Sequence, residues 1–438
     1  MSAVLEDRAA FLEWFGERRA ANTYRVTPVP LDSLDGWHFD PGTGNLGHRS
    51  GGFFTVEGIE ASLGEDVGTW TQPIIIQDEI GILGILVKLF DGKPYFLMQA
   101  KMEPGNVNTL QLSPTVQATR SNYTRVHRGS AVPYLEYFVD PRQGRRVFDS
   151  LQSEQGSWFL AKRNRNMIVE IPEEAEVPAH DSFRWVSQDL LKDLLRIDNV
   201  VNMDSRTVLS GLPFLHGEQS ATGDEPHTKA EILSWFTEAR SNHVLERRRI
   251  PLNQVKGWSR GPERIEHERG TFFTVLGVEV EASSREVARW SQPLLAPVDR
   301  GVVAFLARRT SPEADWQVLV HAQSEAGTSD VVEMSPTVNC VPANYTHLPP
   351  QQRPPFLDHV LTAPPSRIHF DTVLSEEGGR FHHAENRYVL VEVPDDFGAA
   401  AQLPDDYIWM TRRQLTGFVR YGNHVNVVAR SLLACLMD

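Results

Sequence analysis

The feature that most constrains the fold is an internal duplication, because nearly every distinctive motif in the first half of this 438-residue chain returns in the second half. The repeated pairs are Phe11–Phe15 with Ile232–Phe236, Gly36–Trp37 with Gly257–Trp258, Phe53–Val56 with Phe272–Val275, Trp70–Pro73 with Trp290–Pro293, Ser113–Val116 with Ser335–Val338, Asn122–Tyr123 with Asn344–Tyr345, Ser153–Glu154 with Ser375–Glu376, Asn164–Arg165 with Asn386–Arg387, and Asn199–Arg206 with Asn423–Arg430. The offset stays between 219 (Phe53 to Phe272) and 224 (Asn199 to Asn423). Two copies of one module are therefore predicted.

Each module is predicted to run from an amphipathic helix through a strand-rich middle to closing helices, which indicates an α+β fold. The apolar residues of the first helical pattern are Leu5, Phe11, Leu12 and Phe15. Asp91-Gly92 marks a hairpin turn, and Ser187 and Thr411 are the predicted N-caps of equivalent closing helices. The polar, glycine-containing segment from His216 to Pro226 is typical of a linker. We expect a first module at 1–216, a linker at 217–228 and a second module at 229–438.

Composition narrows the class of protein. A net charge of −14 argues against nucleic-acid binding, which requires cationic patches. No apolar run approaches the roughly 20 residues of a membrane span. The first residues lack a basic segment followed by an apolar core, so no secretory signal is predicted. Two cysteines, Cys340 and Cys435, are too few for a disulfide framework or a thiolate metal site. A soluble cytoplasmic protein is expected.

Two stretches, 95–106 and 111–123, alternate with period two, as strands do when one face is packed and the other is polar. The polar side chains are Gln99, Lys101, Glu103, Gln111, Ser113, Thr115, Gln117 and Thr119. Amides, hydroxyls and a Lys/Glu pair suit a polyhydroxylated, phosphorylated ligand. A solvated sheet face without function is the alternative.

The motifs of common cofactor and metal sites are absent or out of place. Gly42–Gly47 has the letters of the dinucleotide fingerprint, but it lies in a loop context rather than between a buried strand and a helix. No P-loop, Gly-x-Ser-x-Gly elbow or His-Glu-x-x-His occurs. The adjacent His382 and His383 cannot easily face one ion. We expect no cofactor and no metal.

The two halves differ where ligand contacts are expected. Arg120–Tyr123 combines a guanidinium, two hydrogen-bonding side chains and a phenol at the end of a polar strand. The second copy has Pro342 in place of Arg120 and Gln323 in place of Lys101. The first module is therefore expected to hold the chemistry, and the second to bind ligand or to be structural. Trp37 and Trp258 are either exposed platforms for a nucleobase or core aromatics.

These motifs resemble the NDP-hexose 2,3-dehydratases of deoxysugar antibiotic pathways. The resemblance rests on Phe53–Val56, Trp70–Pro73, Gln99–Asn106 and Gln111–Tyr123, and it covers nearly the whole chain, including the duplication. It implies two Nudix-like modules, a homodimer and a dTDP-4-keto-6-deoxyglucose substrate. The metal-binding box of the Nudix hydrolases is missing, so pyrophosphate hydrolysis is not expected.

The expected chemistry is loss of water across C2 and C3. A base removes the C3 proton, which lies α to the C4 ketone, and the C2 hydroxyl leaves with help from a general acid. Tautomerisation then gives a 3,4-diketo-2,6-dideoxy sugar, and a redox carrier is not needed because the ketone is already present. Glu103, Glu154 and Tyr123 are the candidate base and acid. Lys101 is expected to stabilise the enolate, and Arg120 to hold the diphosphate.

The family pattern and the internal repeat place further residues around ligand. In the first module these are Trp37, Thr119, Arg120, Ser121, Asn122, Tyr123 and Ser153. In the second module they are Trp258, Asn344, Tyr345, Ser375 and Arg387. A 3-ketoreductase is the expected functional partner, because the diketo product is unstable. A non-catalytic sugar-nucleotide scaffold and a Nudix-type pyrophosphohydrolase are the alternative functions.

Overall fold

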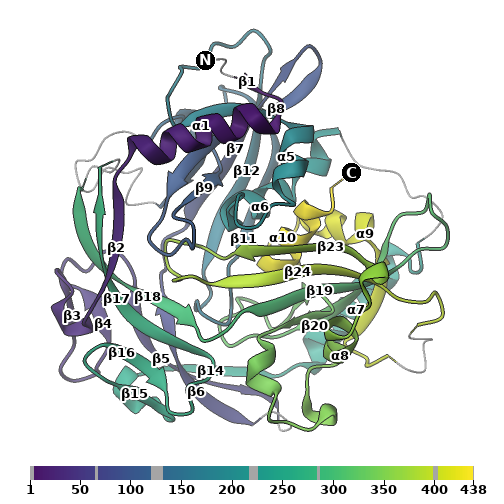
Figure 1. The fold of residues 1–438 in the computed structure, drawn as a ribbon. Coiled ribbons are helices and arrows are strands. Elements are labelled where there is room, and N and C mark those ends of the chain that lie inside the picture. The colour runs from purple at the N-terminus through teal and green to yellow at the C-terminus, as the bar shows by residue number, and fades with distance from the viewer. Residues whose placement is uncertain are drawn as a thin grey trace.

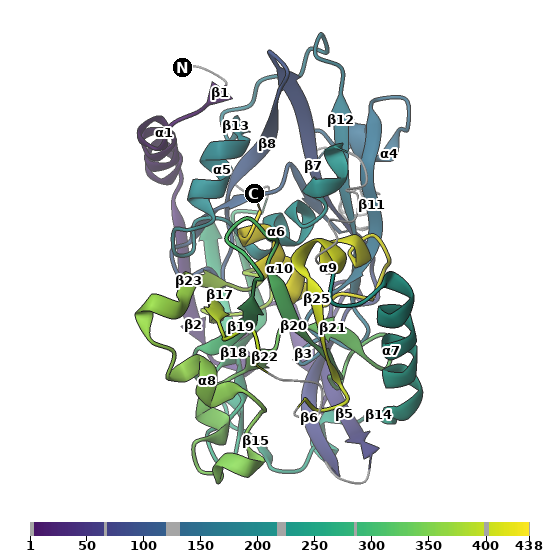
Figure 2. The same ribbon diagram turned by 90° about the vertical axis from the view of Figure 1, so that its right-hand side faces the viewer.

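The computed structural model describes residues 4–64, 68–119, 132–216, 225–283, 287–397 and 403–437. In these ranges the strands form two large mixed sheets and two smaller sheets, with helices packed between and outside them (Figures 1 and 2). This arrangement confirms the α+β class. No helix of the described ranges is long and apolar enough to cross a membrane.

The large sheet of the first half holds the polar stretch that the sequence singled out. Its strands lie in the order β1 (Val4–Leu5), β13 (Phe183–Ser187), β8 (Lys93–Met102), β7 (Gly81–Phe90), β12 (Arg163–Ile171) and β11 (Arg145–Ser153), with β9 (Leu110–Ser113) on β8 and β10 (Val116–Ala118) on β7. β7 and β12 are parallel, whereas β7 and β8 form an antiparallel hairpin. The hairpin turns at Asp91 and Gly92, whose φ angles of 51° and 73° fit a type I′ turn, as predicted.

The large sheet of the second half repeats this plan. Its strands lie in the order β21 (Glu333–Ser335), β20 (Gln317–Gln323), β19 (Gly301–Arg308), β24 (Glu385–Glu392) and β23 (Ile368–Ser375), with β22 (Val338–Cys340) on β19 and β25 (Tyr407–Thr411) on β20. The parallel pair is again the central one, β19 with β24. Each strand has its counterpart in the first sheet, so the duplication seen in the sequence is a duplication of structure.

The two smaller sheets exchange a strand. The first contains β14 (Leu245–Ile250), β5 (Thr55–Leu63), β4 (Leu46–His48), β3 (Trp37–Phe39) and β6 (Thr69–Ile76). The second contains β15 (Trp258–Arg260), β16 (Arg264–His267), β17 (Phe273–Ala282), β18 (Arg289–Pro297) and β2 (Tyr24–Val29). Thus β2 of the first half pairs with β17 of the second, and β14 of the second half pairs with β5 of the first (Figure 1). Neither small sheet is complete within one half of the sequence.

Helices cover the large sheets. They are α1 (Arg8–Ala21), α4 (Glu136–Val139), α5 (Gln188–Leu194), α6 (Met203–Leu209), α7 (Lys229–Asn242), α8 (Leu357–Leu361), α9 (Arg412–Phe418) and α10 (Val427–Cys435), with short 3₁₀ turns η1 (Leu31–Ser33), η2 (Leu212–His216), η3 (Leu252–Gln254), η4 (Pro342–Tyr345), η5 (Pro350–Gln352) and η6 (Pro365–Arg367). Ser187 caps α5 and Thr411 caps α9, as predicted. On α1 the buried face includes Trp14, whereas Leu12 is exposed, so the predicted apolar face was wrong at that position.

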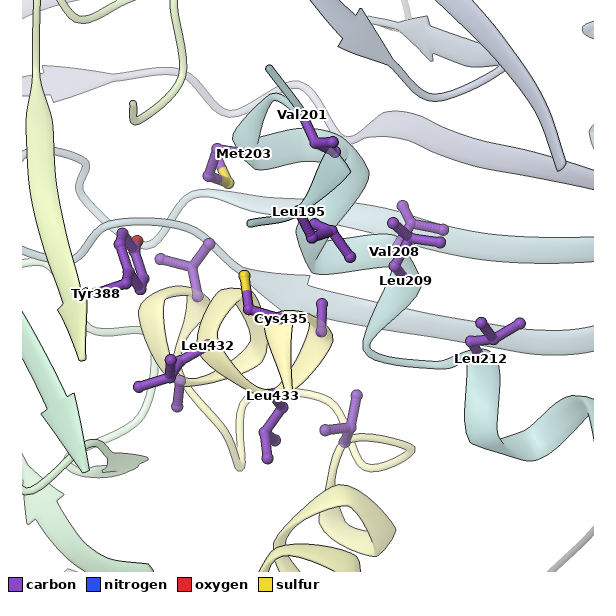
Figure 3. Packing of buried hydrophobic residues seen from close by; sticks show 14 of the residues in the cluster. Leu195, Val201, Met203, Val208, Leu209, Leu212, Tyr388, Leu432, Leu433 and Cys435 are labelled. Atoms are coloured by element: carbon purple, nitrogen blue, oxygen red, sulfur yellow. The ribbon is translucent and has the colours of Figure 1, made fainter. Parts of the chain in front are cut away.

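The two halves meet along α6 and α10, which pack against each other at the centre of the molecule (Figures 2 and 3). Their contact combines apolar side chains with a hydrogen bond from Nε of Arg430 to Oγ1 of Thr207 at 2.8 Å, and every residue of both helices is buried. Arg206 and Arg430 occupy equivalent positions on these helices, and both are fully buried. Each donates a hydrogen bond to a strand carbonyl of the opposite half, Arg206 to Ser375 at 2.7 Å and Arg430 to Ser153 at 2.6 Å. These hydrogen bonds offset part of the free-energy cost of removing the two guanidinium groups from water.

A second reciprocal contact joins loops of the two halves. The amide of Gly105 donates to the carbonyl of Gly378 at 2.7 Å, and the amide of Gly327 donates to Gly156 at 2.7 Å. A Cβ atom on Gly105 would lie 1.7 Å from the carbonyl oxygen of Phe381, so no larger residue fits without moving the backbone. Glycine is therefore required at this close approach.

Replacing Gly105 with alanine tests this contact. The added methyl group collides with backbone rather than with a movable side chain, and we expect Gly105→Ala to lower stability by about 2 kcal/mol or more. Gly16 lies in the middle of α1 with no atom near its Cβ position, so Gly16→Ala is the matched control and is expected to stabilise by about 0.5–1 kcal/mol. Urea denaturation of both variants measures the difference; equal midpoints would contradict the close approach.

Candidate active site

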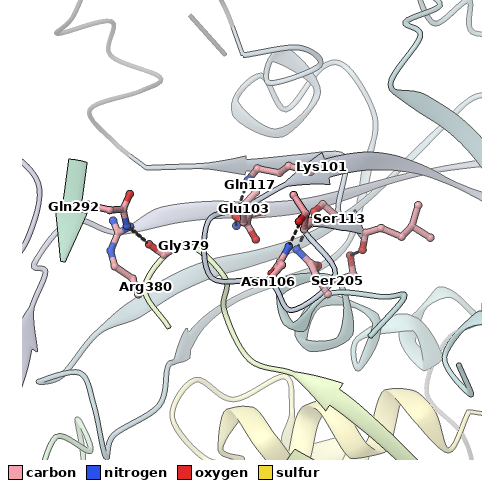
Figure 4. A network of polar contacts seen from close by, with 12 residues as sticks. Lys101, Glu103, Asn106, Ser113, Gln117, Ser205, Gln292, Gly379 and Arg380 are labelled. Atoms are coloured by element: carbon pink, nitrogen blue, oxygen red, sulfur yellow. Dashed lines mark hydrogen bonds and ion pairs between the residues drawn. The ribbon is translucent and has the colours of Figure 1, made fainter. Parts of the chain in front are cut away.

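The polar stretch on β8 and β10 converges on one ion pair. Nζ of Lys101 lies 3.2 Å from Oε1 of Glu103, and Nε2 of Gln117 donates to the same oxygen at 2.9 Å (Figure 4). Both charged side chains are largely buried. Alternation along β8 explains the placement, because Met98, Ala100 and Met102 point into the core on the opposite face. The expectation of a polar face on β8 is confirmed.

The polar residues of the neighbouring stretch are not solvated. Gln111, Ser113 and Thr115 are buried, and Gln111 hydrogen-bonds to Ser375 of the second half at 2.7 Å. This face of the strands therefore packs against protein, where unpaired polar groups would be costly. An ordinary solvated sheet face is excluded for these residues.

Glu154 follows β11 and is buried, and both its charge and those of Lys101 and Glu103 act on Asp204. Its Oε1 accepts a hydrogen bond from Nδ2 of Asn164 at 2.7 Å, whereas no hydrogen-bond partner is present for Oε2 among the described residues. Burial, reinforced by the nearby charge of Glu377, raises the pKa of Glu154 to about 7. Lys162 and Arg430 partly oppose this rise. A carboxyl group with such a pKa exchanges a proton readily near neutral pH.

Four further charged residues belong to the same cluster. They are Lys162 on the loop before β12, Asp204 on α6, and Glu377 and Arg380 on the loop after β23. Burial, together with nearby carboxylates, raises the pKa of Asp204, and burial lowers the pKa of Lys162. The cluster thus combines four carboxyl groups with three cationic groups, and burial is the largest cause of the pKa shifts of Glu154, Lys162, Asp204, Glu377 and Arg380.

The equivalent place in the second half is mostly uncharged. By the internal repeat, Lys101, Lys162 and Asp204 correspond to Gln323, Ala384 and Val428, while Glu103 and Glu154 keep their counterparts Glu325 and Glu376. Glu377 and Arg380 correspond to Gln155 and Trp158. This asymmetry was the signal that sequence reasoning used for Lys101 but did not apply to the other positions. Lys162, Asp204, Glu377 and Arg380 were therefore missed.

The predicted first-module binding residues are only partly brought together. Ser153 is buried next to Glu154, and Thr119 lies just beyond β10. Arg120, Ser121, Asn122 and Tyr123 lie outside the described residues. Trp37 is buried in a separate core, packed 4.9 Å from the ring of Phe54, and its indole N–H donates to Ser291. The interpretation of Trp37 as a core aromatic is thus favoured over an exposed platform.

One edge of Trp37 borders a cavity of about 520 Å³ at the junction of the small sheets. Phe39 and Arg49 of the first half and Arg260 of the second half also line it. The guanidinium of Arg260 lies 3.4 Å over the ring of Phe39 and is paired with Asp32. Residues of both halves line this cavity, so neither half alone supplies its walls.

The predicted second-module residues are dispersed. Trp258 packs 4.6 Å from the Phe273 ring, and Asn344 accepts a hydrogen bond from the Phe272 amide. Tyr345 ends η4, and burial raises the pKa of its phenol. Ser375 lies at the contact with Gln111, and Arg387 is paired with Asp371 on the neighbouring strand.

The described residues include no group of three or more His, Cys, Asp or Glu side chains suited to a metal ion.

Comparison with known proteins identifies the family. Residues 8–212 and again 229–436 match the family described as NDP-hexose 2,3-dehydratase. The chain belongs to the NDP-hexose 2,3-dehydratase family. The resemblance drawn from the sequence motifs is confirmed, and the two matched regions coincide with the two structural repeats.

Three curated members of the NDP-hexose 2,3-dehydratase family carry the name dTDP-4-dehydro-6-deoxy-alpha-D-glucopyranose 2,3-dehydratase. The protein of Streptomyces violaceoruber is 55% identical, covering 99% of this chain and 97% of its own length. That of Amycolatopsis orientalis is 50% identical over 97% of this chain and 88% of its own. That of Saccharopolyspora spinosa is 47% identical, with coverages of 97% and 90%.

The buried carboxyl group of Glu154 makes stability depend on pH. Because its pKa is raised from 4.5 to about 7 on folding, the folded protein keeps a proton that the unfolded chain releases between these values. Stability is therefore lost as pH rises through this window. We expect Glu154→Gln to be more stable relative to the parent at pH 8 than at pH 5, by on the order of 2 kcal/mol. Urea midpoints at both pH values measure this, with the exposed Glu246→Gln as control; a difference independent of pH would contradict it.

Proposed function

We propose that this protein removes water across C2 and C3 of dTDP-4-keto-6-deoxyglucose, giving a 3,4-diketo-2,6-dideoxy sugar nucleotide. The names of relatives 47–55% identical over nearly the whole chain support the substrate and the reaction. The single structural observation that carries the proposal is the cluster of buried acids and bases around Lys101, Glu103 and Glu154. Such a cluster can both remove and deliver a proton without solvent.

The proposal gives each residue of the cluster a separate role. The carboxylate of Glu103 removes the C3 proton, and the ammonium of Lys101, 3.2 Å away, holds the negative charge that forms on the C4 oxygen. The C2–O bond then breaks as Glu154, in its protonated form, gives its proton to the departing hydroxyl, which leaves as water. The remaining C2–C3 enol takes a proton at C2 and releases the proton of its C3 hydroxyl, which gives the C3 ketone. Substrate thus equals product plus one water.

The first module is the catalytic one in this proposal, because Lys101, Lys162 and Asp204 of its cluster are replaced by the neutral Gln323, Ala384 and Val428 in the second. Tyr123 and Arg120 keep their predicted roles as an acid or base and as a diphosphate contact. The Nudix-like nature of the modules, the homodimer, the coupling to a 3-ketoreductase and the cytoplasmic location also stay predictions. A pyrophosphohydrolase lacks its metal-binding box in this sequence, and a scaffold does not require a buried carboxyl group with a pKa near 7.

Incubation with dTDP-4-keto-6-deoxyglucose, a 3-ketoreductase and NADPH traps the product and tests the reaction. We expect the parent protein to give a 2-deoxy sugar nucleotide, and Glu103→Gln to lower its formation by about 10²-fold or more. Glu246→Gln, on an exposed carboxylate, should leave the rate unchanged. A parent protein that forms no 2-deoxy sugar under these conditions would refute the dehydratase.

Exchange in deuterium oxide separates the two proton transfers. If Glu103 is the base and Glu154 the acid, Glu154→Gln should still place deuterium at C3 of recovered substrate while forming little product. Glu103→Gln should do neither. Mass spectrometry of the recovered sugar nucleotide gives both numbers; the reverse pattern would exchange the two roles.

A further inference from the structure

The first-module cluster is not built from the first half alone. The loop after β23, residues 376–383, crosses from the second half and reaches the segment after β8. Gly105 donates its amide to Gly378, and His383 donates its amide back to Gly105, each at 2.7 Å. A Cβ atom on Gly379 would lie 3.1 Å from Oε1 of Glu377 and 3.8 Å from Oε1 of Glu103. The carboxyl groups of Glu103 and Glu377 therefore both lie near Gly379.

Arg380 fixes this loop against the first half. Its Nε donates to Oε1 of Gln77 at 3.0 Å, and its guanidinium lies 4.4 Å over the ring of Phe54. The side-chain amide of Gln292, in the second half, donates a hydrogen bond to the carbonyl of Gly379 in this loop at 2.8 Å (Figure 4). Contacts with both halves thus fix the loop at Gly379 and Arg380. The loop carries two charged residues, Glu377 and Arg380.

We propose that Glu377 and Arg380 are positioning residues of the first-module active site, so that one catalytic site is assembled from both modules. This inference rests on the proposed dehydratase function and names residues that the reaction requires beyond Lys101, Glu103 and Glu154. Glu377 acts on Glu154 through its negative charge. Arg380, whose backbone amide donates to the carbonyl of Glu377 at 3.3 Å, holds the loop that carries Glu377 against the first half.

A structural role alone does not explain the charges. The reciprocal loop of the first half, residues 155–161, makes the same backbone contact with Gly327 and is held by Gln72 in the same way. It does so with Gln155 and Trp158 at the positions of Glu377 and Arg380. Joining the two halves therefore needs neither the carboxyl group nor the guanidinium. Of the two reciprocal loops, only residues 376–383, which reach the charged cluster, carry a carboxyl group and a guanidinium at these positions.

The charged groups that face Glu154 come from several elements. They are Lys162 before β12, Asp204 on α6, Arg430 on α10 and Glu377 on the crossing loop. Of these, Glu377 is the largest charged contribution that favours the protonated form of Glu154, and Lys162 and Arg430 act in the opposite direction. Removing the charge of Glu377 leaves the two cations less opposed, so the pKa of Glu154 falls.

Steady-state kinetics of Glu377→Gln and Arg380→Gln test this role with dTDP-4-keto-6-deoxyglucose and the coupled reductase. We expect kcat to fall about tenfold or more in each variant while KM changes by less than about threefold, because neither side chain is assigned a contact with the substrate. The upper limb of the kcat–pH profile, at which Glu154 loses its proton, should move to lower pH by about one unit in Glu377→Gln. Glu377→Asp should restore most of the parent profile.

The ion pair of the half-buried Glu279 and the exposed Arg289, on the small sheet of the same half, supplies controls in Glu279→Gln and Arg289→Gln. These are expected to leave kcat and the pH profile unchanged. Parent-like kinetics of folded Glu377→Gln and Arg380→Gln would overturn the inference while leaving the dehydratase intact. An inactive parent protein would instead refute the proposed function. A loss of kcat in Glu377→Gln without any shift of the limb would assign Glu377 a structural role and also overturn the inference.

Discussion

Backbone hydrogen bonds between glycines of opposite halves determine how closely the two modules approach. The bond from Gly105 to Gly378 and its reciprocal from Gly327 to Gly156 require that no Cβ atom stands between the chains. At that separation, side chains of one loop lie within reach of the large sheet of the other module. The exchange of β2 and β14 also joins the two halves, since each small sheet contains a strand from the opposite half. The halves therefore behave as one folding unit.

The charged cluster of the first half and the equivalent positions of the second half differ in charge, and the free-energy cost of burying charged groups explains why this difference matters. Removing a carboxylate or an ammonium group from water costs several kcal/mol, and ion pairing recovers only part of it. The second half avoids much of this cost with Gln323, Ala384 and Val428. The first half accepts it at Lys101, Lys162 and Asp204. The second half keeps the carboxyl groups of Glu325 and Glu376 but lacks the cations that correspond to Lys101 and Lys162, and this contrast is the physical reason to place the chemistry in the first half.

Sequence reasoning reached the duplication, the fold class, the helix caps and the Lys101–Glu103 pair, because each depends on local spacing. The sequence did not predict the strand exchange. The patterns of β2 and β14 indicate which residues can form a strand, but they do not indicate which sheet the strand joins. The buried state of Gln111 and Ser113 was missed for a similar reason. Period-two alternation identifies a polar face, and only the packing of Ser375 against Gln111 shows that protein rather than water covers it.

Glu377 shows why one chain with two modules differs from a symmetric pair of single modules. In a dimer of identical modules, a charged crossing loop and a charged receiving cluster would occur twice, and the desolvation cost of every ionised group would double. In a tandem chain the two loops differ, so Gln155 and Trp158 can complete one contact while Glu377 and Arg380 complete the other. The second module then contributes to the reaction through its loop, without a full cluster of its own. Fusion thus allows a twofold scaffold to carry a single, differently charged site.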